Sequence, residues 1–298
     1  MNAVVGDGLG AAAGSLVAGE FPFTARDFRR IAGLIHGAAG ISLPETKAAL
    51  VYSRLAKRLR ALGLRSFKQY CALVEADDEG ADERQRMLVA LTTNVTRFFR
   101  EPHHFEHLKQ TLLPSLIDRA RAGGRVRLWS AGCASGEEAY SMALTVLAAA
   151  PDAPRLDIKI LATDINTEVL ATGRRGLYSP TAVSPIEHEA LQRWFRPVRT
   201  TEGAQAWEAG GSLTGLIAFR ELNLVGDWPM RGRFDAVFCR NVFIYFDDEV
   251  QAGIWKRLPA VLNPGACVYI GHSERLADAE HRFAPEAMTV YRLAGAGA

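Results

Sequence analysis

Two adjacent carboxylates, Glu137 and Glu138, stand at the start of an expected helix, after an apolar run at residues 126–129 and a small-residue turn at 130–136 (SAGCASG). Small residues let the backbone approach a ligand, and a helix start offers unpaired N–H groups, so the segment is typical of a nucleotide-like site. The two acids would repel a pyrophosphate, and the GxGxxG spacing is absent. We therefore expect a ligand with a cationic end, such as the sulfonium and ammonium of S-adenosylmethionine. The alternative is an ordinary strand–turn–helix whose carboxylate interacts with the helix dipole.

A third carboxylate, Asp164, ends the next apolar run, residues 156–163 (LDIKILAT), which suits a buried parallel strand. In nucleotide-binding α/β folds, an acid at the end of the second strand accepts hydrogen bonds from the ribose hydroxyls. We expect this role for Asp164. The alternative is that Asp164 caps the helix expected over residues 167–173.

Polar and aromatic side chains are interleaved in residues 91–104 (LTTNVTRFFREPHH). Asn94, Thr96 and Arg100 alternate there with Phe98 and Phe99. One interpretation is a linker whose aromatic rings fill the core. That interpretation does not explain why a connection between helices carries Asn, Thr and Arg together, so these three are candidate site residues.

The sequence predicts neither a metal site nor disulfide bonds. His103, His104 and His107 lie close together, but we expect no metal site because no acid or cysteine completes a ligand set. The four cysteines form no CxxC pair, and three lie in strongly apolar or small-residue contexts. We expect reduced, buried thiols in a cytoplasmic protein.

A basic segment lies in the N-terminal part, where residues 47–74 hold seven Lys or Arg residues and no acid. Arg54, Lys57 and Arg58 fall largely on one face of the expected helix, with Arg65, opposite a leucine stripe. Such a face is usually only solvated. The absence of compensating acids favours an acidic protein partner, and few aromatic residues are present to stack RNA bases.

The 298-residue chain carries a net charge of +2, with 48% hydrophobic and 23% charged residues, which is ordinary for a globular protein. It is therefore not a nucleic-acid-binding polycation. Residues 1–20 are rich in Gly and Ala and predict a flexible tail, not a signal peptide. No stretch reaches transmembrane length, so we expect a cytoplasmic chain without membrane insertion.

Residues 21–94 predict a small helical domain. We expect a helix capped by Thr24 and ended by Gly40, a second to about Leu62 with Leu55, Leu59 and Leu62 inside, a third capped by Ser66, and a fourth over residues 82–91.

Residues 95–298 predict an α/β domain with a doubly wound, mostly parallel sheet and an antiparallel end. Residues 196–223 lack a helical period, and we expect two or three short antiparallel strands there as an insertion. Ser184 and Glu187 predict a capping box, and Asn263-Pro264-Gly265 a turn before a strand over residues 267–271. Further strands are expected at residues 234–239 and 288–293.

Five stretches in order carry a family resemblance: LTTNVTRFFREPHHF, LWSAGCASGEEAYSMA, ATDINTEVL, FDAVFCRNVFIYFD and LNPGACVYIGHSE. Together they resemble the CheR family of chemotaxis receptor methyltransferases over residues 21–293. The resemblance implies an all-α N-terminal domain and a Rossmann-like, S-adenosylmethionine-dependent methyltransferase domain with a small β-subdomain. It also implies protein-glutamate O-methyltransferase activity that forms γ-methyl esters on the cytoplasmic helical bundle of chemoreceptors, with S-adenosylhomocysteine as product.

The resemblance also assigns residues. Cofactor contacts fall on Asn94, Thr96, Arg100, Glu138, Asp164, Asn223, Leu224, Asn241 and Val242. Arg100 and Tyr245 are the residues nearest the transferred methyl group; whether Glu137 or Glu138 touches the cofactor stays open. The implied partner is a receptor, and whether the β insertion also binds its C-terminal tail peptide stays open. From the basic pattern we predict that the receptor docks on Arg54, Lys57 and Arg58. We expect a monomer.

Two other functions compete with receptor methylation. One is methylation of RNA or of a small acid, and the absence of an NPPY-type motif after the FDAVFC strand argues against amine methylation. The other is a cofactor-binding adaptor without activity, which the presence of Arg100 and Tyr245 disfavours.

Overall fold

The computed structural model describes residues 15–276 and 282–294, and its contacts divide the chain into two compact units, Met1–Thr92 and Thr93–Ala298. The boundary predicted after residue 94 lies close to this division. Residues 1–14 of the predicted flexible tail lie outside the described residues. Within the described part, the Leu16 N–H donates to the Phe23 carbonyl over 2.7 Å.

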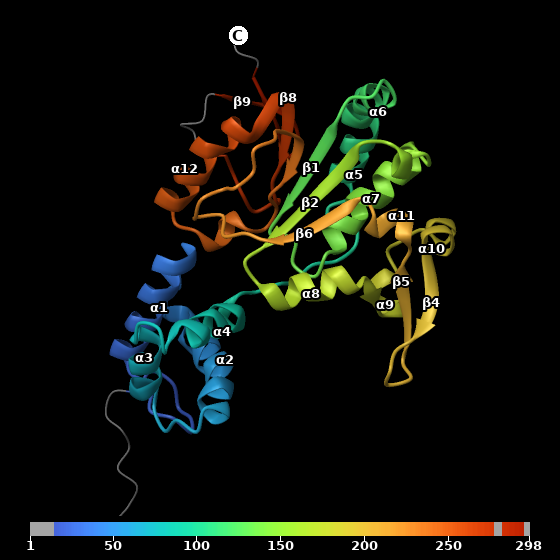
Figure 1. The fold of residues 1–298 in the computed structure, drawn as a ribbon. Helices are drawn as coiled ribbons and strands as arrows, with labels where there is room; N and C mark the ends of the chain where they lie inside the picture. The colour runs from blue at the N-terminus through green and yellow to red at the C-terminus, as the bar shows by residue number, and fades with distance from the viewer. Residues whose placement is uncertain (1–14, 277–281, 295–298) are drawn as a thin grey trace, which may run out of the picture. The chain divides into compact units, whose positions relative to one another are not determined.

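The smaller unit is helical, as predicted (Figure 1). Its helices are α1 (Ala25–Ala39), α2 (Ala48–Ala61), α3 (Phe67–Glu75) and α4 (Ala81–Leu91), with a 3₁₀ turn at Glu45–Lys47. Thr24 and Asp27 form the predicted capping box, Gly40 ends α1 in the left-handed region, and Ser66 caps α3. Leu55 and Leu59 are buried as expected, but Leu62 caps α2 at the surface and is 37% exposed.

The larger unit contains a seven-stranded sheet in the order β6-β2-β1-β7-β8-β10-β9. Its strands are β1 (Val126–Ala131), β2 (Ile158–Asp164), β6 (Ile217–Glu221), β7 (Phe234–Phe238), β8 (Leu262–Tyr269), β9 (Phe283–Ala287) and β10 (Val290–Leu293). The first five strands in the order pair in parallel, and β10 and β9 pair antiparallel at the end. This confirms the predicted doubly wound sheet with an antiparallel end.

Two hydrophobic clusters cover the two faces of this sheet, because strand side chains alternate between faces. Leu128 of β1 and Phe238 of β7 belong to one cluster, while their neighbours Trp129 and Val237 belong to the other. The first cluster takes in helices α5 (His103–His107), α6 (Leu113–Arg121) and α7 (Glu137–Ala149), and the second takes in α12 (Asp248–Arg257). Helix α8 (Thr167–Arg175) follows β2 (Figure 1). The sheet is thus buried on both sides.

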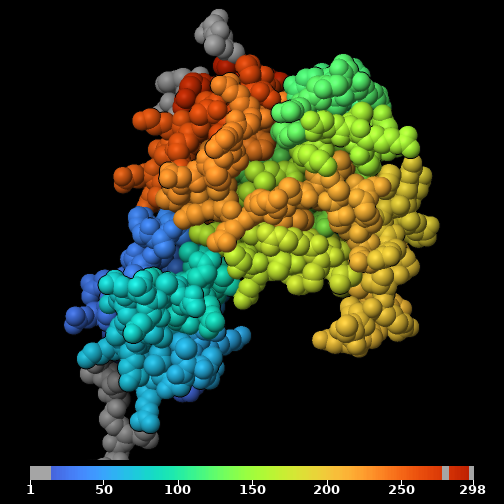
Figure 2. All heavy atoms as spheres, viewed as in Figure 1, coloured from blue at the N-terminus to red at the C-terminus, as the bar shows by residue number. Residues whose placement is uncertain are grey.

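A second, three-stranded antiparallel sheet has the order β3-β5-β4, with β3 (Leu177–Tyr178), β4 (Phe195–Arg199) and β5 (Gln205–Ala209). Short helices α9 (Pro180–Val183), α10 (His188–Trp194) and α11 (Gly211–Thr214) accompany it. Figure 2 shows this yellow lobe projecting from the body of the larger unit.

The bounds predicted for the insertion, residues 196–223, were wrong at both ends. The small sheet begins earlier, with β3, and the last stretch, β6, pairs in parallel with β2 in the main sheet. Alternating apolar residues predict a strand but not its partner, which is set by tertiary packing. The strand β9 was not predicted.

Two local predictions also fail. Ser184 does not begin a helix with a capping box: Ser179 caps the start of α9, Ser184 lies at the C-terminal end of α9, and α10 begins after Glu187 without a side-chain cap. Asn263-Pro264-Gly265 lies inside β8, where the register with β7 jumps from Phe234↔Leu262 to Ala236↔Cys267, so the turn signal marks a bulge. Among the described helices, none is both long and apolar enough to cross a bilayer.

Candidate functional site

The turn after β1 is tied to the end of β2. The N–H groups of Gly132 and Cys133 both donate to the Thr163 carbonyl, over 2.8 and 2.9 Å. Gly132 has φ +82°, and a Cβ there would lie 2.4 Å from Val242 Cγ2. This position therefore requires glycine both for its backbone conformation and for the close approach of the segment after β7.

Asp164 uses both carboxylate oxygens at the end of β2. Oδ2 accepts the Ala134 N–H and Oδ1 accepts the Asn166 N–H, each over 2.9 Å. Burial raises the pKa of Asp164, although these backbone hydrogen bonds oppose the shift. A carboxylate has about four acceptor sites, so two hydrogen bonds leave capacity for ligand hydroxyls. The cap of α8 is Asn166, so the interpretation of Asp164 as that cap was wrong.

The two acids at the start of α7 have different partners. Glu138 accepts a hydrogen bond from Ser130 Oγ (2.7 Å) and pairs with Arg240 Nη1 (3.2 Å). Glu137 accepts from Ser135 Oγ (2.7 Å). Burial raises the pKa of both carboxyls, and the charge of Arg240 opposes the rise only at Glu138.

The segment before α5 contributes one aromatic ring to the core and carries the three polar candidate residues. Phe98 is buried against Tyr178 and Phe195, with ring centroids 5.0 and 6.1 Å away, so one ring does fill the core. Arg100 is half-buried and donates from Nη1 to the Val95 carbonyl (3.0 Å). Asn94 and Thr96 are also half-buried.

Strained backbone surrounds Arg100. Phe99 and Glu101, on either side of it, have φ values of +51° and +55°. Ala134 (+46°) and Asn241 (+60°) are in the same left-handed region. Non-glycine residues adopt this conformation only where their surroundings hold it, and such positions cluster at functional sites.

The segment after β7 is held by Glu274, a buried acid. Its Oε2 accepts the N–H groups of Asn241 (2.8 Å) and Gly271 (2.5 Å). Val242 and Tyr245 are half-buried, and Tyr245 ends the short 3₁₀ helix Phe243–Tyr245.

Asn223 and Leu224 follow β6, next to the end of β2. The Leu222 N–H donates to the Asp164 carbonyl (3.0 Å), which joins the two strand ends. Asn223 Oδ1 accepts the Val225 N–H (3.0 Å), and the Leu224 carbonyl accepts from Trp228 Nε1 (3.1 Å).

The predicted cofactor residues therefore come from the carboxyl ends of four neighbouring parallel strands, β6, β2, β1 and β7, and from the segment before α5. Sequence reasoning missed Arg240, Glu101 and Glu274. Each stands within a few residues of a predicted position or inside a quoted motif, so charged residues within those motifs were the available signal.

The histidine group differs from expectation, because Glu101 supplies the acid that the sequence reasoning found missing. Ligand atoms of Glu101, His103 and His104 lie within 4.8 Å of one another. However, Arg240 Nη2 lies 3.4 Å from Glu101 Oε2, so this carboxylate already has a cationic partner. Burial alone would raise the pKa of Glu101, but His272 and Arg240 outweigh it and lower that pKa to about 2.

The three predicted docking residues belong to the smaller unit and differ in exposure. Arg54 Nη1 donates to the carbonyls of Leu91 (2.9 Å) and Thr92 (2.7 Å) at the end of α4. Arg58 forms a bidentate pair with Glu83, and Lys57 is exposed. The absence of acids near α2 in the sequence was therefore misleading for Arg58, whose partner comes from α4.

Comparison with known proteins gives two family matches. The family described as CheR methyltransferase, SAM binding domain, matches residues 94–292, and the CheR methyltransferase all-alpha domain matches residues 26–92. A probable chemotaxis protein methyltransferase of Rhizobium etli is 49% identical over 265 residues, covering 89% of this chain and 98% of that protein. The chemotaxis protein methyltransferase of Escherichia coli is 41% identical over 269 residues, covering 89% and 90%.

The residues present fit S-adenosylmethionine. Asp164 retains acceptor capacity for ribose hydroxyls, and Gly132 keeps the turn free of a side chain where the backbone approaches Val242. The buried carboxylates Glu137 and Glu138 suit a ligand with positive charge.

Proposed function

This chain belongs to the CheR methyltransferase family, and we propose that it esterifies glutamate side chains on the cytoplasmic helical bundle of a chemoreceptor. As a member it is a methyltransferase with a SAM-binding domain, and its relatives are named for chemotaxis. The observation that most supports a cationic methyl donor is the pair of buried acids at the start of α7, beside the Asp164 strand end.

The proposed reaction needs little proton chemistry. A glutamate side chain with a pKa of about 4.3 is ionised at neutral pH, so the nucleophile needs no general base. When bound, S-adenosylmethionine supplies an electrophilic methyl group: a carboxylate oxygen bonds to the methyl carbon as the S–CH₃ bond breaks, and S-adenosylhomocysteine leaves without any proton transfer. Orientation and exclusion of water are the protein's contributions.

We assign the roles as follows. Asp164 accepts from the ribose hydroxyls, and Arg100 and Tyr245 lie beside the transferred methyl group. The remaining cofactor contacts are Asn94, Thr96, Glu138, Asn223, Leu224, Asn241 and Val242. The half-burial of Arg100 and Tyr245 supports their roles, because it leaves part of each side chain accessible to a substrate.

A direct experiment separates this proposal from its alternatives. The purified chain and methyl-labelled S-adenosylmethionine are incubated in two separate reactions, one with a receptor cytoplasmic fragment and one with total RNA. We expect label on the receptor fragment that mild base releases as methanol, as a carboxyl ester requires. Label on RNA, base-stable label on protein, or cofactor binding by calorimetry without any transfer would each contradict the proposal.

For receptor docking, we propose the exposed basic residues of α2 and of the segment that follows it. Receptor glutamates awaiting methylation make the partner surface negative, and complementary charge speeds encounter and fixes orientation. Lys57 of α2 and Arg65, which follows the end of α2, are exposed and serve this purpose best, because Arg54 and Arg58 also bind within their own unit.

Exposed charges contribute about 0–1 kcal/mol each, so a double reversal is needed to test this docking face. Lys57→Glu with Arg65→Glu should raise the KM for receptor at low salt and leave cofactor affinity unchanged. A matched double reversal at exposed Arg26 and Lys109 controls for net charge. An equal rise in KM in both double variants would remove Lys57 and Arg65 from the docking site.

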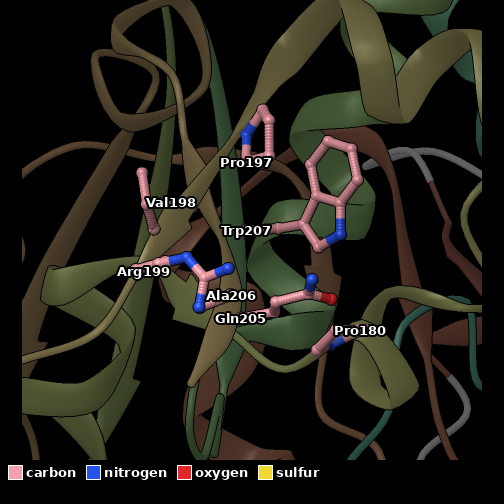
Figure 3. Close-up of a pocket in the computed structure, with 7 residues that line it drawn as sticks. All are labelled: Pro180, Pro197, Val198, Arg199, Gln205, Ala206 and Trp207. Atoms are coloured by element: carbon pink, nitrogen blue, oxygen red, sulfur yellow. The ribbon is translucent and has the colours of Figure 1, made fainter. Parts of the chain in front are cut away.

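We further propose that the small sheet holds a receptor tail peptide. Among the described strands, β4 pairs with β5 alone and stands at the edge of the small sheet. A pocket beside it is lined by residues of α9, β4 and β5: Pro180, Pro197, Val198, Arg199, Gln205, Ala206 and Trp207 (Figure 3). Figure 3 shows Trp207 and Gln205 extending to the same side of β5. Added strands bind through an open edge and side-chain pockets. Trp207→Ala should weaken binding of the receptor's C-terminal peptide in a polarisation assay; unchanged binding would exclude this pocket.

A further inference from the structure

Arg240, the second residue after β7, is a buried charge that connects three segments of the larger unit. Its side chain is 1% exposed. Nη1 lies 3.2 Å from Glu138 Oε2 at the start of α7, and Nη2 lies 3.4 Å from Glu101 Oε2. Nη2 also donates to the backbone carbonyl of Arg100, and the guanidinium lies over the Phe105 ring, 5.6 Å from its centroid.

These contacts fix the backbone at and around Arg100. Arg100 stands between Phe99 and Glu101, which are both in the left-handed region. The Phe99 N–H donates to Ser141 Oγ (2.9 Å), and Glu101 Oε1 pairs with His272 Nδ1 (2.9 Å). Such backbone conformations persist only where several contacts fix them, and Arg240 is the contact that touches both Arg100 and Glu101.

The charges around Arg240 are unequal. One guanidinium faces two acidic side chains, those of Glu138 and Glu101, so the acids outnumber the arginine, which is appropriate beside a cationic ligand. The planar guanidinium can serve both carboxylates and a carbonyl at once. A lysine ammonium keeps the positive charge but lacks the planar, forked set of N–H donors that the guanidinium offers.

We propose that Arg240 is a positioning residue for methyl transfer: it fixes the Arg100 backbone and the Glu138 carboxylate relative to each other. This inference rests on the proposed function, in which Arg100 lies beside the reacting methyl group. Arg240 acts through Arg100 and has no contact with the substrate itself.

A double-mutant cycle tests this coupling. Arg240→Lys is made in the wild-type chain and in the Arg100→Ala chain, and kcat for receptor methylation is measured with both substrates saturating. If Arg240 acts through Arg100, Arg240→Lys should lower kcat at least 30-fold in the wild-type background and less than 3-fold in the Arg100→Ala background. The KM for receptor should change less than 3-fold.

Arg119→Lys is the matched control, because Arg119 pairs with buried Asp235 (2.6 Å) at the opposite end of β7. It should lower kcat equally, if at all, in both backgrounds. The proposal would be overturned if Arg240→Lys lowered kcat by a similar factor in both backgrounds, or if it did not lower kcat in the wild-type background. If Arg240→Lys does not fold, Glu101→Gln replaces it in the same cycle with the same criteria.

The same cycle measured on cofactor affinity by calorimetry separates the two proposals. If the wild-type chain methylates no receptor, the proposed function fails. The affinity cycle then still tests the inference: a loss of cofactor affinity from Arg240→Lys that disappears in the Arg100→Ala background supports the coupling, and an equal loss in both backgrounds refutes it.

Discussion

Arg58, which the basic pattern of α2 offered as a docking residue, should be required for the stability of the smaller unit. Its Nη2 and Nε donate to the two carboxylate oxygens of Glu83 over 2.7 and 3.0 Å. Glu83 is only 5% exposed and also accepts from the Tyr70 hydroxyl (2.9 Å). Arg58→Met would leave the Glu83 carboxylate buried without its cation.

The expected cost follows from this burial. Removing one partner of a buried ion pair costs about 3–5 kcal/mol. The Arg58 side chain is 24% exposed, so water already reaches the guanidinium and the lower end, about 3 kcal/mol, applies. That is a large share of the total stability of a unit of this size, about 5–14 kcal/mol. A charge reversal at Arg58 would therefore test folding more than docking.

The chain offers a clean assay, because all five tryptophans lie in the larger unit and none in residues 1–92. Tryptophan fluorescence therefore reports unfolding of the larger unit, while far-UV circular dichroism reports both. In urea, Arg58→Met should shift part of the dichroism transition to lower concentration and leave the fluorescence midpoint unchanged. Lys57→Met is the control at the neighbouring, exposed residue, and it should change the free energy of unfolding by less than about 0.5 kcal/mol. A cost below about 1 kcal/mol for Arg58→Met would refute the reasoning.

Three further predictions concern the larger unit. Asp164→Ala should weaken S-adenosylmethionine binding by about 1.5–3 kcal/mol in calorimetry, and it should also lower the Tm because two backbone N–H groups lose their acceptor; unchanged affinity would contradict the ribose assignment. Arg100→Ala should lower kcat far more than it lowers the Tm, and wild-type turnover would make Arg100 structural. Burial, aided by Arg240 and His103, lowers the pKa of His104 to about 3. As the pH is lowered, His104 is therefore protonated in the unfolded state before it is protonated in the folded state. The free energy of unfolding should decrease below pH 6.5 by up to about 1.4 kcal/mol per pH unit. If His104→Gln leaves the pH dependence of the Tm, followed by fluorescence, unchanged, this prediction is wrong.

The architecture was largely predictable because it depends on local patterns. Buried parallel strands are continuous apolar runs, and the caps at Thr24, Gly40 and Ser66 act within a few residues of the chain. The carboxyl-end positions of Glu138 and Asp164 followed from strand order alone. Where periodicity did not identify a partner, as for β6, prediction failed, because strand pairing is decided between distant segments.

Charge partners could be identified only from the tertiary structure. Arg58 is 25 residues from Glu83 and Arg240 is 102 residues from Glu138, so no spacing rule links them. The sequence by itself determined which segments carry acids, bases and glycines, and hence the family and the class of ligand. The tertiary structure decided which charges are neutralised in the interior and which remain for a partner, because burial and ion pairing depend on packing between segments that are remote in the chain.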